Sequence, residues 1–252
     1  MKLTGRTAFI TGGDRGIGKG IALALAREGA DIGLTYRKNR EAAETTVREI
    51  ETSGRRALAV QADVTEPEQV RAAVETVLGQ LGAVDILVSN AGIASRGRFI
   101  QETDAEEMLR LFNIHVMGAF HVTRALLPVL RQRPRSDIVF ISSVGSHKCA
   151  AGHGPYAVAK AGLDALALVL AKEELANRIH VNCLACGLVE TDMGAKLVRG
   201  AMGAELKDIT KNLPFGRVCQ PADVGNLCAF LCSEEGGYLS GHIIWLDGGI
   251  QW

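Results

Sequence analysis

The stretch TAFITGGDRGIG, residues 7–18, joins a short apolar strand to the start of a helix through a glycine-rich turn. Gly12, Gly16 and Gly18 allow the chain to turn sharply and bring its amides close to a pyrophosphate. The N-terminus of the helix that follows adds a dipole favourable to an anion. Any tight turn needs glycine, so the motif alone is weak evidence. Its place directly after the first strand favours nucleotide binding.

The rest of the chain alternates short apolar runs with longer helical patterns. Strands are expected at 7–11, 31–36, 57–61, 86–89, 138–142, 180–184 and 243–246, and helices at 18–28, 40–52, 67–78 and 105–130. Such alternation indicates parallel βαβ units, and continuous apolar strands are typical of a sheet covered on both faces. Because no linker or repeat divides residues 1–252, the sequence predicts a single α/β domain. This would be a doubly wound Rossmann fold, with a seven-stranded parallel sheet flanked by helices.

The segment 188–214 does not fit this alternation. It has weak periodicity and several Gly and Met residues. Long segments of this kind often cover the substrate of α/β enzymes, so we predict a flap here. A plain surface helix pair is the alternative.

The composition argues against nucleic acid and membranes as partners. Lys plus Arg total 28 and Asp plus Glu total 28, so no excess charge attracts an anionic surface. Residues 1–6 lack the apolar core of a signal peptide and run directly into the first strand. Apolar runs are short and interrupted, so no segment is expected to span a bilayer. We expect a cytoplasmic protein.

Six cysteines raise the question of a metal site. Without a secretion signal they are expected to be reduced. Two close pairs, 183/186 and 228/232, have a spacing that zinc sites share, but one lies in a β-rich run and the other in a helical pattern. We predict no metal, and thiols that pack as small apolar side chains.

Tyr156, Lys160 and Ser143 carry the strongest indication of chemistry. A spacing of four residues places the phenol of Tyr156 and the ammonium of Lys160 on one helix face, about one turn apart. A tyrosine that exchanges a proton near neutral pH needs a pKa below its usual value of about 10, and a neighbouring cation lowers it. With the glycine-rich turn, these residues indicate a nicotinamide-dependent redox enzyme.

The end of the second strand indicates which nicotinamide cofactor is bound. NAD sites place an acid there to accept hydrogen bonds from the ribose, whereas this chain has Thr35-Tyr36-Arg37-Lys38. Arg15 in the glycine turn would point toward the same corner. Two guanidinium groups suit a 2′-phosphate, so we predict NADP(H). A solvated basic cluster is the alternative.

Together these motifs resemble the short-chain dehydrogenase/reductase family over essentially the whole chain. They match its Thr-Gly-x-x-x-Gly-x-Gly turn, adenine-side acid, strand-four motif, catalytic tetrad, carboxamide-holding segment and terminal strand motif. The matching positions are 11–18, Asp63-Val64, Asn90-Ala91-Gly92, Asn113, Ser143, Tyr156, Lys160, Gly187, Thr191 and Asp247-Gly248-Gly249.

The resemblance implies a role for each member of the tetrad. Tyr156 would give a proton to a carbonyl oxygen while hydride reaches the carbonyl carbon, with Ser143 hydrogen-bonded to the same oxygen. Lys160 would lower the pKa of Tyr156 and hold the nicotinamide ribose. Asn113 would anchor a water molecule that connects Lys160 to solvent.

The family also implies binding positions. Residues expected to bind the cofactor are Gly12, Asp14, Arg15, Gly16, Ile17, Gly18, Tyr36, Arg37, Asp63, Val64, Asn90, Ala91, Gly92, Tyr156, Lys160, Gly187, Val189 and Thr191. Residues expected to contact the substrate are Ser143, Tyr156, His153 and Met193. His153 fits a rim position without proton transfer better than a catalytic role, and packing within its own segment explains Met193 equally well.

Two residues depart from the family pattern. Ser89 stands where Asn is usual, and Cys186 stands where Pro is usual. Cys186 removes a rigid backbone angle at the nicotinamide end and places a thiol beside the site. We interpret it as an unreactive, tolerated substitution.

Three functions stay open at this stage. The overall pattern looks most like the 3-oxoacyl-[acyl-carrier-protein] reductases, for which Arg131, Arg133, Arg135 and Arg178 would supply a basic docking surface near the active-site mouth. A dehydrogenase or reductase of small secondary alcohols, diketones, sugars or steroids shares the same tetrad. A catalytically silent nucleotide-binding scaffold is the non-enzyme alternative. The family implies a homotetramer, paired through helices 105–130 and 155–177 and through the C-terminal strands.

Overall fold

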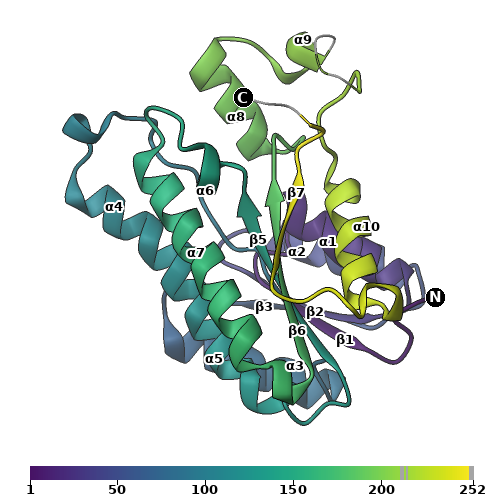
Figure 1. Ribbon diagram of the computed structural model, residues 1–252. Coiled ribbons are helices and arrows are strands. Elements are labelled where there is room, and N and C mark those ends of the chain that lie inside the picture. The colour runs from purple at the N-terminus through teal and green to yellow at the C-terminus, as the bar shows by residue number, and fades with distance from the viewer. Residues whose placement is uncertain (211–212, 214, 250–252) are drawn as a thin grey trace.

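Seven parallel strands form the sheet of the computed structural model, which describes residues 1–210, 213 and 215–249 (Figure 1). Their order is β3-β2-β1-β4-β5-β6-β7, so the chain winds outward from β1 and returns to continue from β4. The strands are β1 (Thr7–Ile10), β2 (Asp31–Tyr36), β3 (Ala57–Gln61), β4 (Ile86–Ser89), β5 (Ser136–Ser143), β6 (Ile179–Cys186) and β7 (His242–Leu246). The predicted fold is confirmed, and its reversal between β1 and β4 opens the crevice where such sheets bind ligands.

Helices cover both faces of this sheet. On one face lie α1 (Gly16–Arg27), α2 (Arg40–Glu51) and α10 (Pro221–Cys232), and on the other lie α3 (Pro67–Leu81), α5 (Gly118–Leu130) and α7 (Gly154–Glu173). Each face has its own apolar core, which explains why β1, β2 and β4 are buried along their whole length. Cys183, Cys186, Cys228 and Cys232 are buried in these cores, as small apolar side chains would be.

The single helix predicted at 105–130 is wrong in one respect. The structure divides it into α4 (Ala105–Phe112), a π-helical turn (Asn113–Met117) and α5. In that turn the amide of Gly118 donates to the carbonyl of Asn113, five residues back. Such a wider turn rotates the residues inside it relative to a regular helix, and π turns occur frequently at functional sites.

Shorter elements complete the carboxyl end of the sheet. They are α6 (Gly145–Lys148), α8 (Asp192–Met202) and α9 (Leu206–Thr210), with 3₁₀ turns at Ile100–Glu102, Leu175–Asn177 and Glu234–Gly236. The segment predicted as a flap contains the helices α8 and α9, which stand beyond the carboxyl ends of β6 and β7 (Figure 1), and its role as a flap stays a prediction. Its last part, residues 211, 212 and 214, lies outside the described residues.

Helix α7 alone among the described helices has the length and apolar composition of a membrane span. Half of its apolar window is buried inside the protein, where α7 packs on α4, β5 and β6. Its apolar side chains therefore form part of the core on this face of the sheet.

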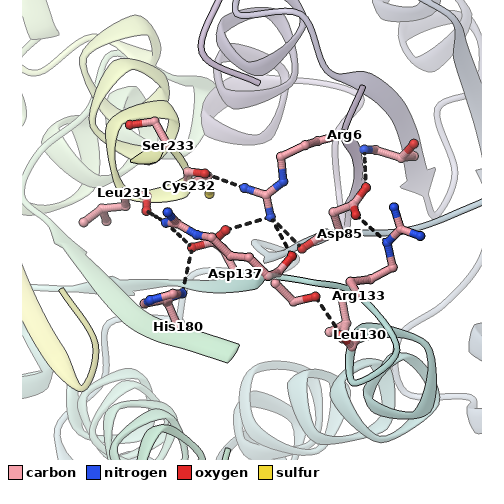
Figure 2. Close-up of polar contacts among 12 residues, drawn as sticks. Arg6, Asp85, Leu130, Arg133, Asp137, His180, Leu231, Cys232 and Ser233 are labelled. Carbon is pink, nitrogen blue, oxygen red and sulfur yellow. Dashed lines mark hydrogen bonds and ion pairs between the residues drawn. The ribbon is translucent and has the colours of Figure 1, made fainter. Parts of the chain in front are cut away.

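The amino ends of the central strands are joined by a buried polar network (Figure 2). Arg6 donates to the carbonyls of Cys232 and Asp85 at 2.5 and 3.1 Å, and its guanidinium lies 2.8 Å from the carboxylate of Asp137. Arg135 also pairs with Asp137, at 3.0 Å. Because Asp137 is 2% exposed, its charge depends on these two guanidinium groups.

This network corrects the expected docking surface. The four arginines proposed for it lie at the amino end of the sheet, whereas Ser143 of the predicted tetrad is the last residue of β5, at the carboxyl end. Three are engaged in ion pairs, and Arg178 directly precedes β6. The ion pairs are Arg131–Glu174, Arg133–Asp85 and Arg135–Asp137, at 2.5, 2.6 and 3.0 Å. The error arose because sequence gives charge but not the end of a strand at which that charge lies.

Candidate active site

The glycine turn after β1 depends on glycine for its backbone angles and its close internal packing. Gly12 and Gly16 have positive φ angles of 64° and 55°. A Cβ at Gly18 would lie 2.1 Å from the carbonyl oxygen of Gly12, so no other residue fits there. The side-chain amide of Asn90 donates to the carbonyls of Thr11 and Gly12 at 2.9 Å and fixes the turn to the end of β4. The amides at the start of α1 then face the crevice, as a pyrophosphate site requires.

Arg15 and Arg37 extend from neighbouring loops beside this turn. The amide of Gly13 donates to the carbonyl of Thr35 at 3.0 Å, which ties the glycine turn to the end of β2. The side chains of Arg15 and Arg37 are 68% and 51% exposed, and their nearest carboxylates, Asp14 and Asp63, are 3.8 and 3.9 Å away. Both guanidinium groups are therefore weakly engaged and available to an anion.

The remaining adenine-side residues lie where the strands β2, β3 and β4 end. Tyr36 and Val64 are buried, whereas Ala91 is partly buried and Ile17 packs against the core at the start of α1. The carboxylate of Asp63 accepts from the amide and hydroxyl of Thr65 at 3.0 and 2.8 Å. Burial raises the pKa of Asp14, which lies inside the glycine turn.

Ser143, Tyr156 and Lys160 come together at the end of β5. Ser143 is the last residue of that strand, and the other two lie on the first turns of α7. The Lys160 ammonium donates to the carbonyl of Ile141 at 2.7 Å and lies 5.8 Å from the centre of the Tyr156 ring. The hydroxyl of Ser143 accepts from the amide of Gly145 at 3.1 Å and is hydrogen-bonded to Tyr156. Three members of the predicted tetrad thus meet.

Burial dominates the acidity of this group. It raises the pKa of Tyr156 to about 12, against the hydrogen bond with Ser143, which lowers it. Burial also lowers the pKa of Lys160 to about 8. From the sequence we expected Lys160 to lower the pKa of the phenol, whereas in the structure burial raises that pKa and the hydrogen bond with Ser143 opposes it.

Asn113, the fourth predicted member, does not lie at the site. Its side chain is exposed at the start of the π-helical turn. His115, two residues further on, is 3% exposed, and its ring lies edge-on to that of Tyr156 with centres 5.5 Å apart. His115, rather than Asn113, therefore lies beside Tyr156 in the structure.

His115 was missed by the sequence analysis, although the sequence contained a signal for it. Leu111, His115, Ala119 and Val122 follow the helical spacing of a buried stripe, and all four are buried. Asn113 lies off this stripe. Nε2 of His115 lies 2.9 Å from the carbonyl oxygen of Ile93, and a Cβ at Gly92 would lie 2.5 Å from the ring. The strand-four motif therefore packs on an imidazole.

The nicotinamide end of the crevice is formed where β6 and β7 end. Gly187 donates to the carbonyl of Leu246 at 2.9 Å, and Val189 bridges to Cys219. Thr191 caps α8 by accepting from the amide of Gly194 at 3.0 Å. Cys186 pairs with Ser143 in the sheet, and burial raises the pKa of its thiol to about 12, so the thiol stays protonated.

The residues expected to contact substrate lie around this opening. His153 is half-buried just before α7, and Met193 is 41% exposed in the first turn of α8. His147 instead packs edge-on to Trp245 of β7, with ring centres 5.2 Å apart. Among the described residues, no group of three His, Cys, Asp or Glu side chains has the spacing of a metal site.

Comparisons with known proteins agree with this geometry. A family model described as enoyl-(acyl carrier protein) reductase matches residues 12–251. The oxidoreductase UcpA of Escherichia coli K12 is 37% identical, covering 98% of this chain and 95% of the relative. The 3-oxoacyl-[acyl-carrier-protein] reductase FabG of Staphylococcus aureus N315 is 33% identical over 99% of both chains.

Solved structures are similar over the whole chain. L-sorbose reductase from Gluconobacter frateurii, complexed with NADPH and L-sorbose, has a TM-score of 0.90 and 33% identity, covering 99% of this chain and 98% of that one. The 3-ketoacyl-(acyl-carrier-protein) reductase of Brucella melitensis, complexed with NADH, has a TM-score of 0.88 and 31% identity over 98% of both chains.

The doubly wound sheet, the glycine turn and the Ser–Tyr–Lys group define a nicotinamide-dependent oxidoreductase. The chain belongs to the short-chain dehydrogenase/reductase family.

Proposed function

We propose that this protein is an NADPH-dependent carbonyl reductase that converts a ketone to a secondary alcohol, with 3-oxoacyl groups as substrate class. The observation that carries this proposal is the meeting of Ser143, Tyr156 and Lys160 at the same carboxyl edge of the sheet as the glycine turn. When bound, the cofactor supplies a hydride to the carbonyl carbon. This leaves the protein to supply a proton and to stabilise negative charge on oxygen.

The side chains divide this work among them. The phenol of Tyr156 donates a proton to the developing alkoxide, and the hydroxyl of Ser143 hydrogen-bonds the same oxygen. A phenol whose pKa is raised to about 12 keeps its proton until the substrate oxygen becomes basic enough to take it. Lys160 places its cation beside Tyr156 and toward the expected ribose position. All three act at the carboxyl end of β5.

The preference for NADPH rests on Arg15 and Arg37. The backbone amides of the glycine turn, at the start of α1, fit a pyrophosphate. The two exposed guanidinium groups beside it fit a further phosphate, because neither is held tightly by a carboxylate. Similar structures contain both NADPH and NADH, so the local arginines rather than the family support this choice.

The 3-oxoacyl substrate class is supported by FabG, which matches this chain over its whole length. A reductase of small ketones, such as sugars, is the second candidate, because a structure with L-sorbose has the same fold at 33% identity. The second candidate gains weight because the arginines first proposed for carrier docking lie at the far end of the sheet. A cytoplasmic location stays a prediction. A homotetramer also stays a prediction, supported by exposed apolar residues on α4, α5 and α7: Leu109, Phe112, Phe120, Val158 and Val169.

One set of measurements tests both parts of the proposal. NADPH oxidation is followed with a 3-oxoacyl thioester, a ketohexose, a diketone and an oxosteroid, and the specificity constants are compared. The proposal expects the thioester to be preferred and NADPH to exceed NADH. Arg37→Asp should reverse the cofactor ratio by about tenfold or more, because each charge-assisted phosphate contact contributes roughly 1.5–3 kcal/mol. Equal constants for NADPH and NADH in the wild type would overturn the cofactor proposal, and a preferred ketohexose would overturn the substrate class.

A further inference from the structure

His115 has a buried nitrogen without a partner. Nε2 lies 2.9 Å from the carbonyl oxygen of Ile93 and 3.3 Å from the amide nitrogen of the same residue. One ring nitrogen cannot both donate to the carbonyl and accept from the amide. The shorter contact is to the oxygen, so we assign the proton to Nε2, which leaves a lone pair on Nδ1. Nδ1 is buried and has no hydrogen-bond partner among the described residues.

Lys160, in contrast, has more hydrogen-bond donors than acceptors around it among the described residues. Its side chain is 5% exposed, and its ammonium carries three N–H donors, of which one reaches the carbonyl of Ile141. No carboxylate lies within 4.0 Å of this ammonium in the described part of the chain. A buried cation therefore has donors to share, and its charge acts on the imidazole of His115.

We propose that Nδ1 of His115 accepts a hydrogen bond from the Lys160 ammonium, directly or through one water molecule, and so positions Lys160 and keeps it protonated. This inference rests on the proposed function, because it takes Tyr156 and Lys160 as the group that delivers the proton. His115 is then a positioning residue: it touches the Tyr156 ring and acts on the reaction through Lys160.

The surroundings allow this role. Burial, together with the charge of Lys160, lowers the pKa of His115 to about 3, so the imidazole is neutral throughout the working range. The other titratable groups that face the pair are Arg110 on α4, Asp164 on α7, and Cys183 and Cys186 on β6. Both thiols stay protonated, because burial raises the pKa of each far above neutral.

The consequence is a shift in pH dependence. An acceptor that hydrogen-bonds the ammonium favours its charged form. Removing that acceptor should make Lys160 lose its proton at lower pH. The decline of ketone reduction on the alkaline side should then begin about one pH unit earlier, since a hydrogen bond to a charged group contributes roughly 1.5 kcal/mol, or about one unit.

Two substitutions separate this role from simple packing. His115→Asn places an amide oxygen near the position of Nδ1 and abandons the contact with Ile93. His115→Gln reaches Ile93 and has no acceptor at the Nδ1 position. The turnover number for NADPH-dependent ketone reduction is measured from pH 6 to 10 for both, and for His115→Phe, which keeps the ring and loses both nitrogens.

We expect His115→Asn to keep the alkaline limb of the pH profile, where activity declines, at the wild-type pH. In His115→Gln and His115→Phe this limb should shift to lower pH by about one unit. His180→Phe is the matched control, because it removes a largely buried histidine at the opposite end of the sheet and should lower stability without moving the limb. A limb that moves with His115→Asn but not with His115→Gln would overturn the inference, as would an unchanged limb in all variants. If Tyr156→Phe, measured in parallel, stays active, the proposed function fails instead.

Discussion

The two ends of β5 hold buried charge in opposite ways. At the amino end, Asp137 is 2% exposed and lies within 3.0 Å of the guanidinium groups of Arg6 and Arg135. At the carboxyl end, Lys160 lies beside the strand with 5% exposure and, in the described part of the chain, no carboxylate within 4.0 Å. At the amino end the buried carboxylate is paired with guanidinium groups of the protein. At the carboxyl end the buried ammonium has no carboxylate partner among the described residues.

This difference indicates that the amino end of the sheet contributes mainly to stability and the carboxyl end mainly to activity. Breaking a buried ion pair leaves an uncompensated charge and costs about 3–5 kcal/mol, so the amino end is sensitive to any loss. A buried cation without a carboxylate partner carries a desolvation cost, and groups with strongly shifted pKa values are concentrated at functional sites. Substitutions at the two ends should therefore separate: the amino end should lose stability, and the carboxyl end should lose activity.

The largest effect is expected from Tyr156→Phe. The variant keeps ring packing and removes the proton donor, so turnover should fall by at least about 10²–10⁴-fold while NADPH still binds. Ser143→Ala should lower turnover by a factor on the order of 10²–10³, by analogy with other oxyanion donors. The loss in the double variant should be smaller than the product of the two single losses, because the residues act as one unit. Steady-state reduction and cofactor fluorescence titration provide the measurements. A Tyr156→Phe enzyme that kept most of its activity at neutral pH would contradict proton donation by Tyr156.

Asp137→Asn tests the amino end. It leaves Arg6 and Arg135 without their shared carboxylate, so the free energy of unfolding should drop by about 3–5 kcal/mol. The turnover number should stay within about twofold of wild type, because the substitution is at the far end of the sheet. Urea denaturation and initial rates give the two numbers. A loss of turnover with unchanged stability would erase the contrast between the two ends.

Lys160→Met tests the cost of the unpaired cation. Burial lowers its pKa from 10.5 to about 8, so the unfolded chain binds this proton more tightly than the folded one. Wild-type stability should therefore rise relative to the variant between pH 8 and 10.5. Below pH 8 the penalty is at most about 3 kcal/mol, partly offset by the hydrogen bond to Ile141.

At neutral pH the Lys160→Met protein should consequently be as stable as wild type or more so, although it should have lost activity and bind NADPH more weakly. Urea denaturation at pH 7 and pH 10 measures this, with Lys172→Met, an exposed lysine of the same helix, as the control. A Lys160→Met protein less stable than wild type by several kcal/mol would mean that the cation is paired.

The sequence predicted the elements that depend on local pattern. Residues 7–18 determine the first strand, turn and helix, and the spacing of Tyr156 and Lys160 follows from helix geometry. What it did not predict depends on irregular backbone or on tertiary burial. The π-helical turn at 113–117 is such a backbone feature, although the helical spacing of the buried residues already favoured His115 over Asn113, and the pKa of Tyr156 follows from burial that no spacing reveals. The prediction of a docking surface failed for a third reason, since the sequence shows neither the end of the sheet at which those arginines lie nor the distant partners of Arg131 and Arg133.

The smallest expected effect is also the one that decides between Asn113 and His115. Asn113 is exposed, so Asn113→Ala should change stability by less than about 0.5 kcal/mol, as surface substitutions usually do. Its backbone carbonyl, which accepts from the amide of Gly118, is retained by alanine, so the π turn should persist. Turnover and its pH profile should therefore match wild type, while His115→Phe changes both. A tenfold loss of turnover in Asn113→Ala would show that Asn113, and not His115, is the fourth member of the tetrad. It would also mean that the exposed side chain of Asn113 turns inward when substrate binds.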